Sequence, residues 1–384
     1  MKHTLINTMA ILAIACLVSC SENQNTETTT KSYKAVVADS VVFNYLPEVQ
    51  LKDYDEESEQ LLLKDRSSQK IIILNKSGRI EAEFNPFVEG PNYVGPWDFG
   101  WIFFGEDSLI CYGQTHIYLL TREGEIINKM PFPVEIESQW LLDFDPRTLF
   151  NYTDKEKEKF VAMISGPLGP KPRTQAFQDS VNMVYSIDLN TGQGNAIMPK
   201  LPESTYRSAG EYLGRGWPYM VNYSGSKFAQ MYELDPSVYF WNADKNELIN
   251  SIKIPETYWP EYKGVAFEEK GKPEILRHNV NIFSAGKFII VQNLGRIPDE
   301  LDKQIKQLDN WQESEEYKSA IRKYLKSVYL LFDENQYLGE LDITEITPIS
   351  WLKLDTKEDF FWVQRTYNDE RDYRTFLKVK IVED

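Results

Sequence analysis

Histidine and cysteine are scarce in this sequence, with three of each among 384 residues. Three of these six side chains lie in the first twenty residues, which leaves only His116, His278 and Cys111 for the rest of the chain. A single thiol cannot form an intramolecular disulfide, so the fold depends on a hydrophobic core. Two histidines and one thiol are also too few for the usual closed zinc sites. We therefore expect no metal site and no cofactor.

The local motifs of the common enzyme classes are missing as well. The chain has no G-x-S-x-G, P-loop, G-x-G-x-x-G or H-E-x-x-H, which removes local support for serine hydrolases, NTPases, dinucleotide enzymes and zincins. Asp143 with Asp145, and Asp369 with Asp372, have the short spacing of calcium ligands without the full loop pattern, so turn and surface roles are favoured. Carboxylate pairs that cleave glycosides leave no local signature, and such an enzyme stays open.

Basic residues are outnumbered, with 42 Lys and Arg against 58 Asp and Glu and a net charge of −16. Lys2 is the one charged residue before position 20. A chain cut before Cys20 would therefore have 41 basic and 58 acidic residues and a net charge of −17. Nucleic acid and anionic lipid surfaces attract clustered Lys and Arg. The balance argues against both as partners.

Long apolar runs are limited to the N-terminus, where ten apolar residues span positions 9–18 after the positive charge of Lys2. This pattern is typical of an export signal, and a membrane-spanning helix would need about 20 such residues. Leu17, Val18, Ser19 and Cys20 match the lipobox of bacterial lipoproteins. That resemblance implies lipidation of the Cys20 thiol and cleavage after Ser19, and an ordinary cleaved signal is the alternative.

Residues 21–32 contain no apolar side chain, so they cannot contribute to a core and are expected to form a disordered tether. The predicted organisation is a signal peptide at 1–19, the lipidated cysteine and tether at 20–32, and a single domain at 33–384. Two or three acyl chains on Cys20 would be a stable membrane anchor by themselves. The predicted location is the cell envelope, on the outer membrane, with the membrane as a partner only through this lipid.

A repeated pattern runs through the mature chain. Val or Ile followed by Tyr in an apolar strand is followed, six or seven residues later, by Gly or Asn, which permit a hairpin turn with positive φ. The copies are Ile117 and Tyr118 with Gly124; Val184 and Tyr185 with Gly192; Val238 and Tyr239 with Asn246; Val328 and Tyr329 with Asn335; and a looser copy, 71–74 with Gly78. Another apolar strand precedes each hairpin. This arrangement predicts an all-β fold with the blades of a β-propeller.

A sixth copy, 360–365 followed by 375–382, ends the chain without a fourth strand. Residues 34–43 precede the first copy and have no partner of their own, so they can supply the missing strand. Such closure would remove an unpaired edge from the ring. We therefore predict a six-bladed β-propeller closed by its N-terminal strand, with a two-sheet β-sandwich as the alternative.

One stretch, about 296–326, has a helical pattern. Pro298, Asp299 and Glu300 are typical of a helix start, and apolar residues then recur near the helical period. The sequence predicts a helical insertion on one face of the domain. A decoration packed through its apolar stripe is favoured over a partner-binding device.

The lipobox, the repeated strand-and-turn copies, and Glu89, Gly90, Pro91 and Asn92 after the first blade resemble a family of lipid-anchored Bacteroidetes-type proteins of unknown function with a propeller-like body. The resemblance covers most of the mature chain. It implies a fold and a cellular address, and it carries no assigned chemistry.

Aromatic and polar residues gather where one predicted blade connects to the next. In a propeller these connections surround one mouth of the central channel, a common ligand site. Trp rings could pack on sugar faces while Arg, Asn and Asp bind hydroxyls, and the alternative is that each Trp is a wedge between blades. The candidates are Asn92, Trp97, Asp98 and Trp101; Gln139 and Trp140; Arg207, Arg215, Trp217 and Tyr219; Arg277, His278 and Asn279; and Trp351.

Two functions follow from these patterns. The favoured one is a lipid-anchored, non-catalytic propeller that binds a glycan, a peptide or a protein partner at the cell envelope. The alternative is a glycan-active hydrolase or lyase with carboxylates at the same mouth. An acid pair within about 10 Å in the mouth, with one member desolvated and raised in pKa, would favour the enzyme, and an aromatic mouth without such a pair would favour binding.

Overall fold

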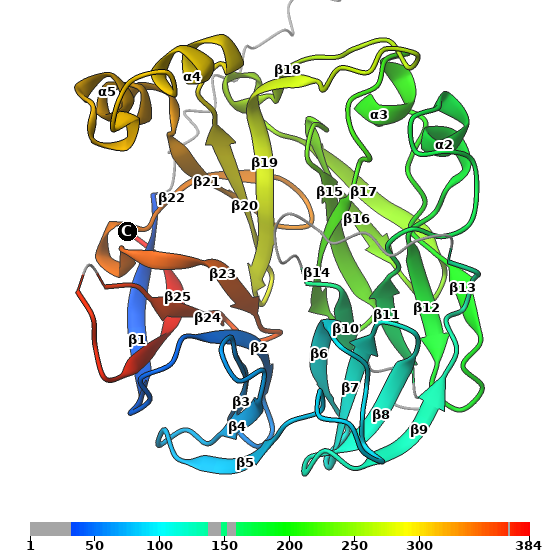
Figure 1. Ribbon diagram of the computed structural model, residues 1–384. Coiled ribbons are helices and arrows are strands. Elements are labelled where there is room, and N and C mark those ends of the chain that lie inside the picture. The colour runs from blue at the N-terminus through cyan, green and yellow to red at the C-terminus, as the bar shows by residue number, and fades with distance from the viewer. Residues whose placement is uncertain (1–31, 137–146, 152–158, 368) are drawn as a thin grey trace, which may run out of the picture. The chain divides into compact units, whose positions relative to one another are not determined.

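The computed structural model describes residues 32–136, 147–151, 159–367 and 369–384. In this part of the chain, strands form four separate four-stranded sheets and one nine-stranded sheet. Each four-stranded sheet is an antiparallel meander whose strands follow one another in the sequence. These are the blades of a propeller (Figure 1).

The first four blades take their strands in sequence order. Blade 1 has β2 (Val49–Asp55), β3 (Gln60–Asp65), β4 (Ile71–Leu74) and β5 (Ile80–Phe84). Blade 2 has β6 (Asp98–Phe104), β7 (Ser108–Gly113), β8 (Ile117–Thr121) and β9 (Ile126–Met130). Blade 3 has β10 (Leu149–Asn151), β11 (Lys159–Met163), β12 (Val184–Asp188) and β13 (Gly194–Ala196). Blade 4 has β14 (Pro218–Ser224), β15 (Lys227–Tyr232), β16 (Ser237–Asn242) and β17 (Glu247–Lys253).

The nine-stranded sheet contains two further blades and one added strand. Blade 5 has β19 (Glu274–Ala285), β20 (Phe288–Gly295), β21 (Ser327–Phe332) and β22 (Tyr337–Asp342). Blade 6 has β23 (Ile349–Asp355), β24 (Phe360–Arg365), β25 (Arg374–Glu383) and β1 (Tyr33–Phe43). Two parallel pairings between β1 and β22 join these blades, and β18 (Glu261–Lys263) adds to the free edge of β19.

The six blades form a closed ring. Their first strands contact one another in the cycle β2, β6, β10, β14, β19, β23 and back to β2. These are therefore the innermost strands, and Figure 1 shows the blades arranged around them. The predicted six-bladed propeller is confirmed, and the β-sandwich alternative is wrong.

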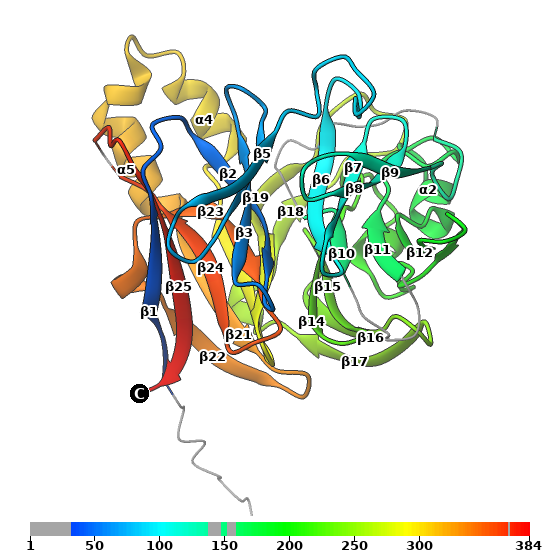
Figure 2. The same ribbon diagram turned by 90° about the horizontal axis from the view of Figure 1, so that it is seen from below.

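The N-terminal strand closes the last blade, as the sequence predicted. β1 pairs antiparallel with β25 from Tyr33 opposite Glu383 to Phe43 opposite Arg374. The two strands lie side by side in Figure 2. The pairing extends one residue further, since the Asp384 amide donates to the Ser32 carbonyl at 2.9 Å.

Burial follows the position of each strand in its blade. All four residues of β4, in the middle of blade 1, are buried because neighbouring blades cover both of its faces. In the outermost strand β17, partly buried and exposed residues alternate, as expected where one face meets solvent. Aromatic side chains fill the spaces between blades: Trp101 is 2% exposed and packs with Leu62 of blade 1 and Leu109 of blade 2.

Most hairpin turns adopt the backbone that the sequence predicted. Gly124 has φ 90° and Asn246 has φ 51°, both in the left-handed region that these residue types tolerate. The fifth hairpin differs, because Asn335 is not among the positive-φ residues. There the Asp333 carboxylate accepts the amides of Asn335 and Gln336 at 2.8 and 2.9 Å, and this side-chain capping shapes the turn instead.

The innermost strands begin at one face of the ring, which we call the insertion face. Three contacts bring adjacent blades together there. Lys64 pairs with Asp98, the Thr148 hydroxyl donates to the Phe99 carbonyl at 2.6 Å, and the Asn279 amide donates to the Asp235 carbonyl at 2.9 Å.

All α-helices among the described residues lie in connections at the insertion face. They are α2 (Gln175–Ser180), α3 (Thr205–Ser208), α4 (Asp299–Ile305) and α5 (Glu315–Tyr324). The last two, with the short 3-10 helix η2 (Trp311–Glu313) between them, form the predicted helical insertion and connect β20 to β21 (Figure 1). No helix in the described ranges is long and apolar enough to cross a membrane.

Candidate functional site

Connections from three blades fasten to one another on the insertion face. Arg173, ahead of α2, donates to the carbonyls of Phe267 and Gly271, both at 2.9 Å, and its guanidinium lies 4.2 Å from the Tyr212 ring centre. Tyr212, which follows α3, forms a β-bridge with Val265 from the connection between blades 4 and 5. Backbone and side-chain contacts therefore hold these connections together on this face.

The predicted candidates in 92–101 divide into structural and exposed side chains. The Asn92 side chain accepts the Ile126 amide at 3.1 Å, which ties the connection to β9. Asp98 is paired with Lys64 and its side chain is 2% exposed. Trp101 packs between blades 1 and 2, so it is one of the wedges that the sequence analysis gave as the alternative to a ligand contact. Trp97 is 42% exposed and can meet a ligand.

The candidates in 207–219 mostly pack or bind backbone. Arg207 donates to the Lys200 carbonyl at 2.9 Å and lies 3.5 Å from Asp179. Trp217 is partly buried against the core of blades 3 and 4, and Tyr219 is buried between blades 4 and 5. Burial raises the pKa of Tyr219 well above its ordinary value. Arg215 is partly exposed.

The candidates in 277–279 differ from one another in exposure. Asn279 is fully buried, and its amide group donates to the Asp235 carbonyl. His278 is 8% exposed and lies 2.7 Å from a Glu233 carboxylate oxygen. Arg277, one residue earlier on β19, is part of a cavity described below.

The remaining candidates either lie outside the described residues or side chains, or lie on the surface away from the other candidates. Gln139, Trp140, Asp143 and Asp145 lie outside the described residues, and Trp351 belongs to β23 although its side chain is not among those described. Asp369 pairs with Arg371 at 2.8 Å on the surface. The segment around Trp97 belongs to blade 2 and Arg277 to blade 5, which stand opposite each other in the ring. The candidate segments therefore share a face, and their convergence on one small ligand stays a prediction.

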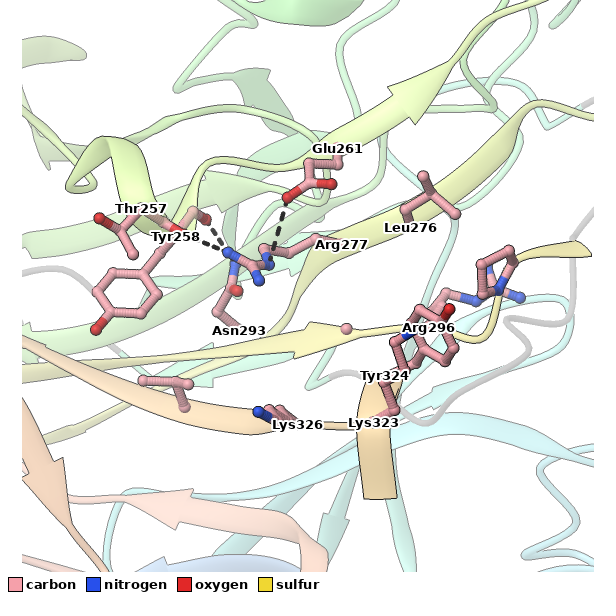
Figure 3. Close-up of a pocket in the computed structure, with 13 residues that line it drawn as sticks. Thr257, Tyr258, Glu261, Leu276, Arg277, Asn293, Arg296, Lys323, Tyr324 and Lys326 are labelled. Atoms are coloured by element: carbon pink, nitrogen blue, oxygen red, sulfur yellow. Dashed lines mark hydrogen bonds and ion pairs between the residues drawn. The ribbon is translucent and has the colours of Figure 1, made fainter. Parts of the chain in front are cut away.

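A cavity of about 300 Å³ opens on the insertion face beside blade 5 (Figure 3). This volume is at the lower end of the range for small-molecule sites. Its walls come from the 3-10 helix η1 (Glu256–Tyr258), from β18, from the start of β19 and end of β20, and from the end of the helical insertion. The lining residues are Thr257, Tyr258, Glu261, Leu276, Arg277, Asn293, Gly295, Arg296, Pro298, Lys323, Tyr324, Lys326 and Val328.

One wall of the cavity is held by a hydrogen-bond network. The Arg277 guanidinium donates to the Thr257 carbonyl and lies 3.9 Å from a Glu261 oxygen. The Asn293 amide group donates to the Tyr258 carbonyl at 3.1 Å. The Tyr258 hydroxyl binds the Glu340 carboxylate, and this bond, together with burial, raises the Tyr258 pKa to about 12.

The opposite wall depends on a glycine. The Gly295 amide donates to the Lys326 carbonyl at 3.1 Å, so the end of β20 lies directly against the chain leaving α5. A side-chain carbon at position 295 would overlap the Tyr324 carbonyl oxygen. Figure 3 shows the side chains of Arg296 and Tyr324 together on this side.

Charge in the lining is strongly biased. Four side chains are cationic (Arg277, Arg296, Lys323 and Lys326), and Glu261 is the one carboxylate among the lining residues. The whole chain has the opposite bias, −16. Because four cations and one carboxylate surround this opening, the local charge favours anions over cations.

A buried carboxyl lies elsewhere on the same face. Burial raises the pKa of Asp235 to about 6, although hydrogen bonds from Ser204, Tyr239 and the Thr205 amide act to lower it. The side chain of a general acid must reach its substrate. Asp235 is fully buried, with both carboxylate oxygens bonded, so its raised pKa is a structural consequence of burial.

Sequence reasoning identified Arg277 and missed the other cations of the cavity. Arg296, Lys323 and Lys326 lie at the two ends of the helical insertion, which the sequence did predict. Basic residues at both ends of an insertion were the available signal. No such signal marked Tyr258 and Glu261, because the short elements that contain them, η1 and β18, have no apolar pattern.

No family model matches the chain, and no curated protein matches it. Among solved structures, a member of the DUF4221 family from Bacteroides vulgatus is similar, with 13% sequence identity, a TM-score of 0.60, and coverage of 92% of this chain and 100% of that chain. A protein from Bacteroides fragilis has 10% identity and a TM-score of 0.48, covering 92% of this chain and 95% of its own. The WD40 domain of Neurospora crassa Pan2 has 9% identity and a TM-score of 0.41, covering 91% and 96%. The likeness to the Bacteroides vulgatus structure shows a shared fold.

Proposed function

We propose that the protein is a lipid-anchored, non-catalytic binding protein of the bacterial cell envelope. In this proposal Cys20 carries the lipid, residues 21–32 are the tether, and the propeller displays a binding cavity on its insertion face. The proposed ligand class is a glycan, a peptide or a protein segment. The lipobox and the ten-residue apolar run support the anchor.

The cavity beside blade 5 is the observation that carries the binding proposal. Besides β19 and β20, its walls use parts that a four-stranded blade does not need: η1, β18 and the insertion between β20 and β21. Fixed polar groups line it, including the Arg277 guanidinium and the Asn293 amide. Preformed concave sites with a few positioned polar groups are typical of ligand binding.

The lining favours binding over glycoside cleavage. Hydrolysis by the common mechanisms needs two carboxyl groups across the scissile bond. Glu261 is the only carboxylate among the lining residues, and it faces Arg277. The enzyme alternative therefore has less support in this cavity than the binding function.

A glycan and peptide screen on the fragment 32–384 tests the proposal, with the hits then measured on variants. We expect Arg277→Ala to weaken binding at least about tenfold, equal to about 1.4 kcal/mol. It should lower the free energy of unfolding less than Phe240→Ala, a fully buried core substitution that costs about 3 to 5 kcal/mol.

Trp97→Ala is the matched control, because Trp97 is exposed on the same face at the opposite blade. Binding that is lost in Trp97→Ala and kept in Arg277→Ala would move the site to blade 2. Absence of any ligand in the screen would count against the binding function itself.

A further inference from the structure

We infer that the cavity beside blade 5 binds an anionic ligand, namely a small molecule or a single terminal residue that carries a carboxylate, phosphate or sulfate group. This inference rests on the proposed function and specifies the ligand class of the same site. It is carried by the charges of the lining, by which of them are paired, and by the size of the cavity.

The strongest observation is a contrast within the helical insertion. Its basic residues away from the cavity each have a carboxylate partner: Lys306 lies 2.6 Å from Asp302, Lys318 lies 3.1 Å from Glu315, and Lys303 and Arg322 lie 3.9 and 3.8 Å from Glu300 and Glu315. The cations that line the cavity differ. Arg296, Lys323 and Lys326 are exposed at the edge of the cavity, and none of them has a carboxylate within ion-pair distance in the described part of the chain.

Like charges gathered around one cavity repel each other, and a negative charge bound between them would relieve that repulsion. The chain has an excess of acidic residues, yet it places only Glu261 in this lining. An anionic ligand would supply the missing negative charge. The four cations come from β19 and from the two ends of the helical insertion, so one ligand could meet several of them at once.

Arg277 has a positioned guanidinium with unused N–H donors that could bind an anion. Its hydrogen bond to the Thr257 carbonyl positions the guanidinium, Glu261 lies 3.9 Å away, and only part of the donor set of Arg277 is used. Arginine recognises carboxylate, phosphate and sulfate-like oxyanions through paired N–H groups, whereas lysine contributes a mobile point charge. Glu261 would then compete with the ligand for Arg277.

The volume limits the size of what can enter. About 300 Å³ accommodates a compact ligand or one terminal unit of a longer chain, and it is too small for an extended polymer segment. The Tyr258 and Tyr324 side chains add apolar surface beside the cations. A sugar acid or a small phosphorylated or sulfated molecule has the matching combination of charge and carbon skeleton.

Calorimetric titration of the purified full chain tests the inference. The probes are glucuronic acid, galacturonic acid, inorganic phosphate and inorganic sulfate, with glucose as the neutral partner of the sugar acids. We expect at least one anion to bind, glucose to bind at least about tenfold more weakly, and the affinity to fall between low salt and about 0.15 M salt.

Three variants connect the binding to this cavity. The double variant Lys323→Gln with Lys326→Gln should weaken anion binding about tenfold or more, and Glu261→Gln should strengthen it by removing the competing carboxylate. Lys245→Gln is the matched control. It removes one exposed cation from the β16–β17 turn, at the opposite face of the ring, and should leave the affinity unchanged.

Two sets of results would contradict the inference. If no anion binds, or if anions bind equally to the double variant, the inference is wrong. If the screen for the proposed function finds a neutral ligand that requires Arg277 and is insensitive to Lys323 and Lys326, the anion inference fails while the binding function stands.

Discussion

A side chain at Gly295 would overlap the carbonyl oxygen of Tyr324, so the last residue of β20 and the end of α5 can approach only because position 295 has no Cβ. The Gly295 amide uses this closeness to donate to Lys326 at 3.1 Å. The contact fixes the end of the helical insertion against blade 5. Gly295, Tyr324 and Lys326 all line the cavity, so this contact is part of its wall.

Gly295→Ala should therefore push the 324–326 segment away from β20. We expect a loss of about 1 to 3 kcal/mol in the free energy of unfolding and a further loss of ligand affinity. Chemical denaturation and titration measure the two effects. Gly271→Ala is the control, since a Cβ there would make only ordinary contact with Val265 at 3.5 Å. Equal stability of both variants would show that the insertion is not held by this contact.

Ring closure predicts unequal effects of two N-terminal deletions. Removal of 33–44 takes away β1, whose Val41 and Phe43 are buried, so their burial alone is worth about 3 to 6 kcal/mol. It also exposes the edge of β25. Removal of 21–31 leaves Ser32 and the whole of β1 in place and should not change the melting temperature. Similar melting of the two truncated proteins would contradict a closing role for β1.

The buried carboxyl predicts a pH dependence of stability. Because burial raises the Asp235 pKa to about 6, against an ordinary 3.8, the native state binds more protons than the unfolded state between about pH 4 and 6. The contribution of Asp235 to stability is thus greatest below that window and is lost as pH rises through it. Asp235→Asn cannot ionise, so its stability relative to wild type should increase by about 2 to 3 kcal/mol from pH 4 to 7. Denaturation curves at several pH values would show this, and parallel profiles would contradict it.

If Cys20 carries a lipid anchor, the Cys20→Ala substitution should change how the protein is held at the membrane. Cys20→Ala removes the thiol that the lipobox resemblance assigns to lipidation, and the ten-residue apolar run is too short to span a bilayer. The variant should be released from membranes by salt or carbonate. Retention that only detergent reverses would argue against a lipoprotein, and mass spectrometry of the mature N-terminus is the direct check.

Local patterns predicted much of the fold. The hairpin of Ile117–Thr121 with Ile126–Met130 was visible because apolar alternation and a turn residue are properties of neighbouring residues. The innermost strands were harder to recognise. β10 has only three residues, and its pairing with β11 depends on partners further along the chain. Trp101, within β6, was ambiguous for a similar reason, since a Trp has the same neighbours in the sequence whether it packs between blades or contacts a ligand.

Residues close together in the chain were enough to predict the repeat of strands and turns, the strand at 34–43, the helical insertion and the signal-like N-terminus. The cavity could not be predicted in this way, because it depends on tertiary contacts. Tyr258, Arg277, Arg296 and Lys323 are brought together only when β18 adds to the edge of β19 and the insertion packs against Gly295. Electrostatic and steric relations between distant segments depend on distances in space, and no local pattern of residue types contains them.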